Sequence, residues 1–127
     1  MAGESDLSVL LREMEPVRRP GEFVLVSLPD DPGVDCEALV REDEGVTVVV
    51  RRELADERGW AYDFIAAWLS LRVHSDLAAV GLTAAISAAL AREGISANVI
   101  AGYFHDHLLV PADRAMDALA ALEALAS

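Results

Sequence analysis

Residues 74–110 read HSDLAAVGLTAAISAALAREGISANVIAGYFHDHLLV, and this stretch decides the fold that the sequence predicts. A polar loop opens it and an alanine-rich helix follows, expected over residues 80–93. Two apolar runs come next, at 97–104 and 108–110, on either side of the polar sequence His105-Asp106-His107. These runs are typical of two strands joined by a turn.

The expected helix has clear signals at its core face and at its end. Leu82, Ile86 and Leu90 recur every four residues, which gives the helix one narrow apolar stripe. Gly94 suits the left-handed position that ends many helices, and Ile95 after it can contact Leu90 in a Schellman stop. A helix that packs closely on a sheet is therefore predicted.

The rest of the chain supplies flanking strands and helices. We expect an apolar strand at 64–73 before the central helix, and a last helix after Pro111 whose apolar face includes Met116, Leu119 and Leu122. The first half predicts a helix at 7–14 capped by Ser5 or Asp6, strands at 23–28, 36–41 and 46–50, and a short helix at 52–58 closed by Gly59.

The element order is therefore αβββα followed by βαββα. The second half lacks only one strand of a ferredoxin-like βαββαβ unit, and the first half has strands to spare. We predict an α+β fold in which the two halves exchange strands. This arrangement gives two intertwined lobes with antiparallel sheets covered by helices on one face.

Composition excludes several classes of partner. The chain has 127 residues, a net charge of −12 and no lysine, which argues against binding to nucleic acid or to anionic membranes. No apolar run reaches the roughly 18 residues that a membrane span needs. The first residues, MAGESDLS, lack the features of a signal peptide. A soluble cytoplasmic protein is expected, and its single Cys36 is expected to be a small core residue.

The segment 74–110, with its neighbouring strand and helix, resembles an ACT domain. Asp76 stands in the loop where the family often has Asp, and Val80-Gly81-Leu82 stands where the family has Pro-Gly before the first helix. Val80 departs from that pattern. Gly94-Ile95-Ser96-Ala97-Asn98-Val99-Ile100 is similar to the family's passage into its second strand.

Nearly the whole chain is similar to small uncharacterised bacterial proteins with tandem ACT-like lobes. The supporting segments are LLREMEPV at 10–17, PGEFV at 20–24, REDEGVTVVV at 41–50 and the run at 73–111. This resemblance implies a degenerate lobe at 1–61 and a second ACT-like lobe at 62–127. It also implies a regulatory protein that binds a small effector, usually an amino acid, and that forms homo-oligomers such as a homodimer.

A candidate effector site follows from the loop before the central helix. Free N–H groups at a helix N-terminus favour an anion such as a carboxylate, and Gly81 permits close approach. Asp76 and Asn98 are candidates to accept from an ammonium group, since the strand of Asn98 is expected beside the strand that ends at His74. The predicted ligand-binding residues are Ser75, Asp76, Val80, Gly81, Leu82, Asn98, Val99 and Ile100.

Simpler roles compete with each of these assignments. Ser75 or Asp76 can cap the helix, Gly81 can serve packing alone, and Asn98 can face water. An ACT-fold interaction or dimerisation module that has lost its ligand site is therefore the alternative to an effector-binding protein.

The histidines raise a third possibility, a small enzyme or metal site. His105 and His107 lie two apart, and His74 is a possible third ligand, but histidines in a turn are usually solvated. The adjacent residues His74-Ser75-Asp76 project in different directions, so they do not form a catalytic triad. We expect no catalytic residues, no metal and no cofactor.

Overall fold

A computed structural model describes residues 3–126, and these divide into two compact units. Unit 1 joins Met1–Pro20 to Ala67–Ser127, and unit 2 is Gly21–Ala66. Strand β5 (Ile65–Leu71) runs from one unit into the other, so it supplies residues to both. Each unit is described below by itself.

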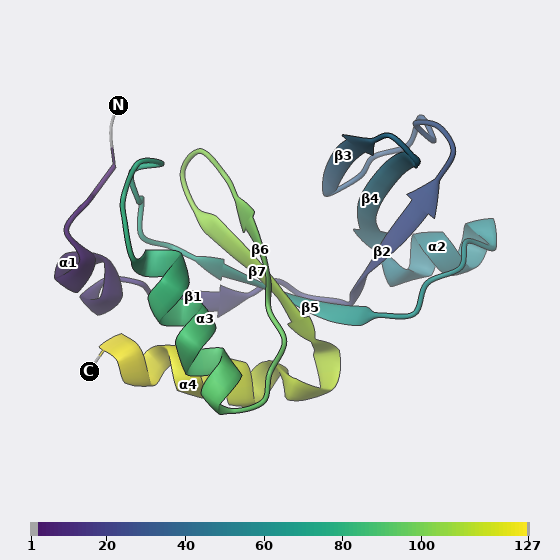
Figure 1. Cartoon of the computed structure of the whole chain (residues 1–127). Coiled ribbons are helices and arrows are strands. Elements are labelled where there is room, and N and C mark those ends of the chain that lie inside the picture. The colour runs from purple at the N-terminus through teal and green to yellow at the C-terminus, as the bar shows by residue number, and fades with distance from the viewer. Residues whose placement is uncertain (1–2, 127) are drawn as a thin grey trace. The chain divides into compact units, whose positions relative to one another are not determined.

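Unit 1 is a four-stranded sheet with helices. Its elements are α1 (Leu7–Arg12), β1 (Pro16–Arg18), most of β5, α3 (Leu82–Arg92), β6 (Asn98–Ala101), β7 (Asp106–Pro111), a 3₁₀ turn at Ala112–Arg114 and α4 (Ala115–Ala126) (Figure 1). The strand order is β1-β5-β7-β6. The βαββα segment predicted from the second half of the sequence is thereby confirmed.

The fourth strand of unit 1 comes from the N-terminal segment. Val17 of β1 pairs with Ser70 of β5, and the two strands are antiparallel. This strand is absent from the elements predicted from the sequence, which place nothing between the helix at 7–14 and the strand at 23–28. With β1 in place, unit 1 has the complete strand set of the ferredoxin-like ACT fold.

The core of unit 1 lies between the helices and one face of the sheet. Alternate residues of β5 and β7 point into it because successive strand residues face opposite sides. The fully or almost fully buried side chains of this core are Leu10, Met14, Ala67, Leu69, Leu71, Leu82, Ile86, Leu90, Ile95, Leu108, Val110, Ala115, Ala118 and Leu122. Helix α1 therefore contributes to the same core as the central helix.

Helix α3 ends as the sequence predicts. Gly94 has a φ of +70°, in the left-handed region. The Ile95 amide donates to the Leu90 carbonyl at 2.9 Å, and the Gly94 amide donates to the Ala91 carbonyl at 3.0 Å. These two bonds define a Schellman motif, and Ile95 is buried next to Leu90.

Two predictions near the C-terminus are wrong. Asp106 and His107 are the first residues of β7 and not a turn, because Ala101 pairs with Asp106 and Ile100 pairs with His107. Met116 is 81% exposed and does not belong to the apolar face of α4, in which Ala115, Ala118 and Leu122 are buried and Leu119 packs partly buried against the core.

Unit 2 is a smaller sheet with one helix. Strands β2 (Phe23–Leu28), β3 (Ala38–Glu42) and β4 (Gly45–Arg51), together with the first residues of β5, have the order β3-β4-β2-β5. Helix α2 (Arg52–Arg58) packs on β2 and β4 and ends at Gly59, as predicted. Residues 29–37 form no helix, so this lobe is a reduced version of the ferredoxin-like unit.

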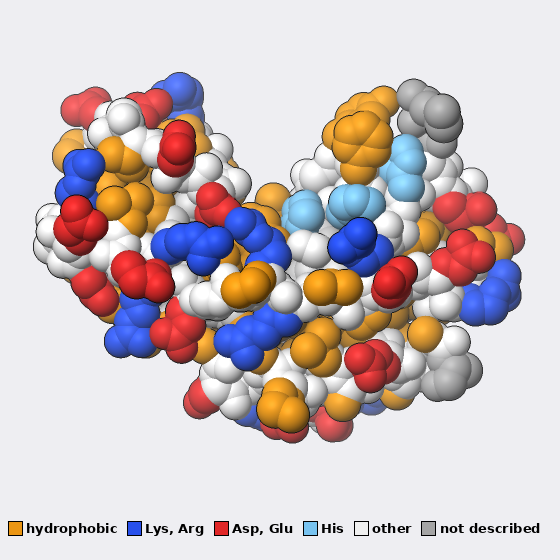
Figure 2. Space-filling model, turned by 180° about the vertical axis from the view of Figure 1, so that it is seen from behind, with side chains coloured by type: hydrophobic (Ala, Val, Ile, Leu, Met, Phe, Trp, Pro, Cys, Tyr) orange, Lys and Arg blue, Asp and Glu red, His pale blue; other side chains and the backbone are white. Residues whose placement is uncertain are grey.

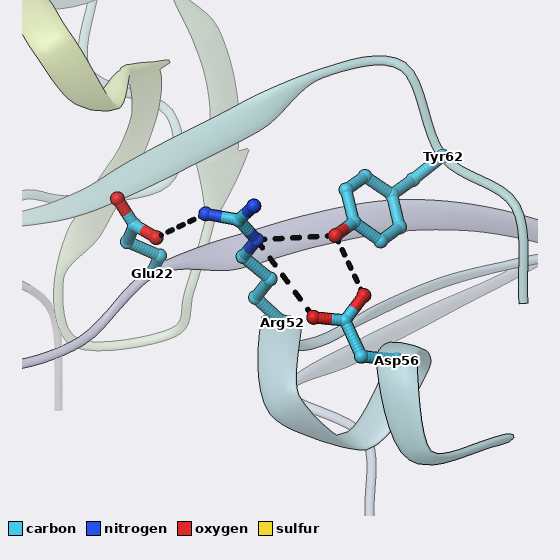
Figure 3. A network of polar contacts seen from close by, with 4 residues as sticks. All are labelled: Glu22, Arg52, Asp56 and Tyr62. Carbon is cyan, nitrogen blue, oxygen red and sulfur yellow. Dashed lines mark hydrogen bonds and ion pairs between the residues drawn. The ribbon is translucent and has the colours of Figure 1, made fainter. Parts of the chain in front are cut away.

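A polar network anchors helix α2 within unit 2 (Figure 3). Arg52 donates from Nη1 to Glu22 Oε1 at 2.9 Å and from Nε to the Tyr62 hydroxyl at 3.1 Å. The Tyr62 hydroxyl in turn donates to Asp56 Oδ1 at 2.7 Å. The hydrogen bonds to Tyr62 and Glu22 raise the pKa of Arg52. Through Arg52, the first residue of α2, the network joins Glu22, which precedes β2, to Tyr62, which follows the helix.

Replacing Tyr62 with phenylalanine is expected to destabilise the protein by about 0.5 kcal/mol. The hydroxyl is half-buried and joins two charged groups, so its loss removes two hydrogen bonds whose net value is small near solvent. Urea unfolding followed by circular dichroism measures the change. Tyr103→Phe is the matched control because no polar contact to that exposed side chain is found among the described residues, and it should leave the unfolding midpoint unchanged.

The compact units divide the chain differently from the sequential lobes at 1–61 and 62–127. Residues up to Pro20 belong to the same unit as the C-terminal part because β1 pairs with β5 and α1 packs in its core. The sequential division itself stays a prediction. Within residues 3–126 no helix is both long enough and apolar enough to cross a lipid bilayer.

Candidate functional site

The loop between β5 and α3, residues 75–81, is held in place by the N-terminal segment. The Glu4 amide donates to the His74 carbonyl and the Asp76 amide donates to the Glu4 carbonyl, both at 2.8 Å. Gly3 approaches so closely that an added Cβ would lie 2.5 Å from the His74 carbonyl oxygen. This contact joins residues that lie about 70 positions apart, so no local pattern in the sequence predicts it.

The N-terminus of helix α3 has no side-chain cap. Gly81 occupies the N-cap position with a φ of +102°, and no side chain accepts a hydrogen bond from the first turn. The first amide groups of a helix have no carbonyl partner within it. This helix start therefore presents N–H groups and a positive dipole end, both of which favour an anionic group.

Ser75 and Asp106 connect the loop to the start of β7. Ser75 is only 7% exposed, and its hydroxyl donates to Asp106 Oδ2 at 3.2 Å. Asp76 Oδ1 accepts from the Ala78 amide at 2.9 Å, so this carboxylate orders the loop and does not cap α3. Asp106 is a functional candidate that sequence reasoning missed, because the residue was assigned to a turn.

A cavity of about 150 Å³ lies where these elements meet. Four predicted site residues line it, namely Ser75, Asp76, Gly81 and Leu82. The others lining it are Leu77, Ala79, Thr83, Ala101 and Asp106. The lining thus combines two carboxylates and two hydroxyl groups with apolar side chains, and it contains no basic residue.

The remaining predicted site residues do not line this cavity. Val80 is 84% exposed. Asn98, Val99 and Ile100 lie in β6, and β7 separates this strand from β5. The expectation that the strand of Asn98 lies beside the strand leading to His74 is therefore wrong.

A larger groove of about 770 Å³ opens elsewhere on unit 1. It is lined by Arg12, Glu13, Glu15, Pro16, Arg72, Val73, His74, Glu123 and Ala126. Most of these residues are exposed and charged, and none of them lines the loop cavity. Size alone therefore does not make this groove the better candidate.

The histidines lie close together (Figure 2) but make different contacts. His74 packs against Phe104, with 5.2 Å between ring centroids, and Phe104 and Tyr103 are exposed at the β6–β7 turn. Figure 2 shows the histidine side chains in pale blue, close together on the side of unit 1 seen from behind. Across residues 3–126, however, no three histidine, cysteine or acidic side chains are grouped in a way that could hold a metal ion.

His107 belongs to a polar cluster on the sheet face opposite the helices. Its Nδ1 lies 2.8 Å from the Ser70 hydroxyl oxygen and 3.3 Å from the Trp68 indole nitrogen. The indole N–H also donates to the Ser70 hydroxyl oxygen at 3.1 Å, and a neutral imidazole whose Nδ1 accepts is compatible with all three contacts. Burial, followed by repulsion from His105, lowers the pKa of His107 below its ordinary value of 6.5.

Acid is therefore expected to weaken the fold through His107. Because the pKa is lower in the folded state, the unfolded chain binds more protons as the pH drops below 6.5. The free energy of unfolding should decrease as the pH falls from 6.5 through the lower pKa of the folded state. Above pH 6.5 it should not depend on this group. Urea unfolding between pH 5 and 8 measures this dependence. His107→Asn keeps an acceptor near Ser70 but cannot titrate, so an unchanged pH dependence in this variant would contradict the assignment.

The fold and the sequence together define the class of protein. Models of the ACT domain match residues 2–67 and again residues 64–124. The chain therefore belongs to the ACT domain family and carries two such domains in tandem. A regulatory, ligand-binding role of the ACT type follows from this membership.

Solved structures extend the comparison. A protein of unknown function from Vibrio cholerae, described as a possible transport protein, is 40% identical, with a TM-score of 0.87 over 95% of this chain and 96% of that one. The regulatory subunit of aspartate kinase from Thermus thermophilus, in a ligand-free form, is 14% identical, with a TM-score of 0.65 over 91% and 99% of the two chains. This second likeness concerns the fold. The comparison with curated proteins finds no match.

Proposed function

We propose that this protein is a non-catalytic regulator that binds an amino-acid effector in the cavity beside loop 75–81. The observation that carries the proposal is this cavity of about 150 Å³ at an uncapped helix N-terminus, with Asp76 and Asp106 in its lining. An α-amino acid has the matching pair of groups. Its carboxylate suits the helix N-terminus, and its ammonium suits the two carboxylates.

The loop has the rigidity that an effector site needs. Backbone hydrogen bonds to Glu4 hold His74 and Asp76, and the Ser75 hydroxyl bonds to Asp106 of the neighbouring strand. A site that is already ordered loses less conformational entropy when it binds a ligand. This arrangement supports binding of a ligand at the loop.

Association of copies is part of the proposal. Strand β6 lies at the edge of the sheet of unit 1, and an edge strand presents unpaired backbone groups that can pair with another chain. We expect copies of the protein to form a homo-oligomer through such edges. This homo-oligomer would then regulate partner proteins. Analytical ultracentrifugation would detect the dimer, and a monomer at all concentrations up to 0.1 mM, roughly the upper end of the micromolar range, would contradict this part.

The direct test is titration calorimetry with the twenty amino acids and common acidic metabolites. Saturable binding of an amino acid at millimolar concentration or below supports the proposal. Ala101→Leu would fill the cavity and should abolish binding, whereas Ala91→Leu, on the exposed side of α3, should bind normally. A folded protein that binds none of these compounds would refute the amino-acid effector.

An interaction module without a ligand is the second candidate. Four large apolar side chains around the loop and the β6–β7 turn are exposed, namely Leu77, Val80, Tyr103 and Phe104. Val80 also stands where the resemblance expects proline. Under this alternative, Val80→Ser should weaken the association of copies, and neither the variant nor the unmodified protein should bind an amino acid. Under the effector proposal, both proteins should bind the amino acid.

A further inference from the structure

We infer that the aromatic rings of His74, Tyr103 and Phe104 dock an arginine side chain of a partner protein. These three residues, called the ring cluster below, lie after β5 and in the β6–β7 turn of unit 1. The inference concerns the protein that the regulator acts on, so it does not require an effector in the loop cavity. It is carried by the exposure of the rings, by the arginine contacts of other rings in the chain and by the local charge.

The ring cluster leaves two large aromatic side chains in solvent. The His74 ring centroid lies 5.2 Å from that of Phe104 and 6.5 Å from that of Tyr103, and the last two centroids are 5.0 Å apart. Tyr103 is 58% exposed and Phe104 is 59% exposed, and neither belongs to the core of unit 1. Contiguous exposed apolar side chains of this kind often mark an interaction site.

The backbone holds the ring cluster in place. The His74 carbonyl accepts from the Glu4 amide at 2.8 Å, and the Gly102 amide donates to the His105 carbonyl at 2.9 Å across the β6–β7 turn. The rings also pack on one another across the two segments. A surface that is ordered in this way loses less conformational entropy when a partner binds.

Arginine stacks on aromatic rings elsewhere in this lysine-free chain. The guanidinium carbon lies near the ring centroid in the pairs Arg19 with Trp68 at 4.8 Å, Arg51 with Phe23 at 5.0 Å, Arg58 with Trp60 at 5.8 Å and Arg52 with Tyr62 at 6.0 Å. Within residues 3–126, no arginine contacts the rings of Tyr103 or Phe104 in this way. Their open faces can therefore accept a guanidinium from another molecule.

The charge near the ring cluster favours a cation. Arg92, at the far end of α3, is the only arginine between Val73 and Asp113 in the sequence. Asp76 and Asp106 lie two residues from His74 and Phe104, and their carboxylates are held by hydrogen bonds to the loop. The net charge of −12 also steers a positively charged partner toward the protein. Arginine suits the rings better than lysine because its planar guanidinium is weakly hydrated and stacks on aromatic faces.

The surroundings fit an arginine within a polypeptide. His74 belongs to the ring cluster and also lines the groove of about 770 Å³. Three glutamates line this groove, Glu13, Glu15 and Glu123, against two arginines. Residues that flank the docked arginine would therefore have an adjoining groove in which to lie, and basic side chains among them would meet carboxylates.

Titration with matched peptides, followed by NMR of the folded protein, tests the inference. The probe is acetyl-GARLRAG-amide, and the controls replace both arginines with lysine, which keeps the charge, or with citrulline, which keeps the shape without it. The arginine peptide should bind about three- to tenfold more tightly than either control, and should shift the ring protons of Tyr103 and Phe104. Equal binding of the lysine or citrulline peptide would overturn the assignment of arginine.

The double variant Tyr103→Leu with Phe104→Leu tests the rings themselves. Leucine keeps an apolar surface but has no π face, and both positions are exposed, so the urea unfolding midpoint should change little. Its affinity for the arginine peptide should fall by about three- to tenfold. Met116→Ala, which truncates another exposed apolar side chain, is the control and should bind the peptide as the unmodified protein does.

The outcomes also separate this inference from its alternatives. Unchanged binding of the arginine peptide by the double variant would place its site elsewhere and overturn the inference. Ring-proton shifts that depend on protein concentration, without peptide, and that accompany dimer formation would assign the ring cluster to contacts between copies. Specific peptide binding by a protein that binds no amino acid would refute the effector and leave the docking of arginine supported.

Discussion

Replacing Met14 with alanine is expected to lower the free energy of unfolding by about 3 kcal/mol. Met14 is fully buried in the core of unit 1, although it lies in the N-terminal segment that sequence order assigns to the other lobe. Truncating a buried methionine removes transfer free energy and leaves a cavity that neighbouring side chains fill only in part. Its carbonyl also accepts from the Arg72 amide, so the backbone there is anchored to the end of β5.

Met116→Ala is the matched control for this prediction. The same atoms are removed, but Met116 is 81% exposed, so the change should stay within about 0.5 kcal/mol. Urea unfolding of both variants gives the comparison. Equal losses at the two positions would contradict the assignment of residues 3–20 to the core of unit 1.

Replacing Gly81 with valine is expected to cost about 3 kcal/mol of stability and to abolish effector binding. Its φ of +102° is a backbone conformation in which a β-branched residue is strained. An added Cβ would also lie 3.1 Å from Leu7 Cδ2, so the Leu7 side chain would have to move away from the loop. A displaced loop would no longer hold the cavity lining in place.

Gly94→Val separates strain from contact. Gly94 also has a positive φ, +70°, but an added Cβ there meets no atom within 4 Å. This control should lose about 1 to 2 kcal/mol from backbone strain alone and keep its ligand. If thermal unfolding shows the same loss for both variants, the close packing of Leu7 on Gly81 plays no part in stability.

Local signals predicted the helices and most of the strands. The four-residue repeat of α3 and its glycine stop depend on residues within one segment, so they are readable from the sequence. Strand β1 was missed because Pro16–Arg18 is only three residues long and its partner, Leu69 to Leu71, lies about 50 residues away. Nothing in such a short segment shows an alternation of apolar and polar residues.

Two polar residues were misassigned for a related reason. Asp106 and His107 have the composition of a turn, but their partners are Ser75 on the loop and Ser70 on β5. Those partners place them in a strand, which local propensity does not reveal. Met116 was misassigned because it is apolar at a helical spacing from Leu119, whereas the buried face of α4 begins one residue earlier, at Ala115.

The candidate site was predicted in part. Ser75, Asp76, Gly81 and Leu82 do line one cavity, because a loop and the helix after it are contiguous in sequence. Asn98 was placed next to them on an assumed strand order, and β7 in fact lies between β5 and β6. Asp106 lines the cavity where Asn98 was expected, and it lies at the start of β7, where the sequence predicts a turn.

Nitrogen-15 NMR of the folded protein during titration with each of the twenty amino acids tests the central claim most directly. Saturable shifts are expected for the backbone amides of residues 75–83, 101 and 106, with the amides at the start of α3 among the largest. Residues of the β3–β4 turn in unit 2 should stay unchanged and serve as the internal control. Saturable shifts confined to other residues, or no shifts at 10 mM, about tenfold above a millimolar Kd, would contradict an effector site at this loop.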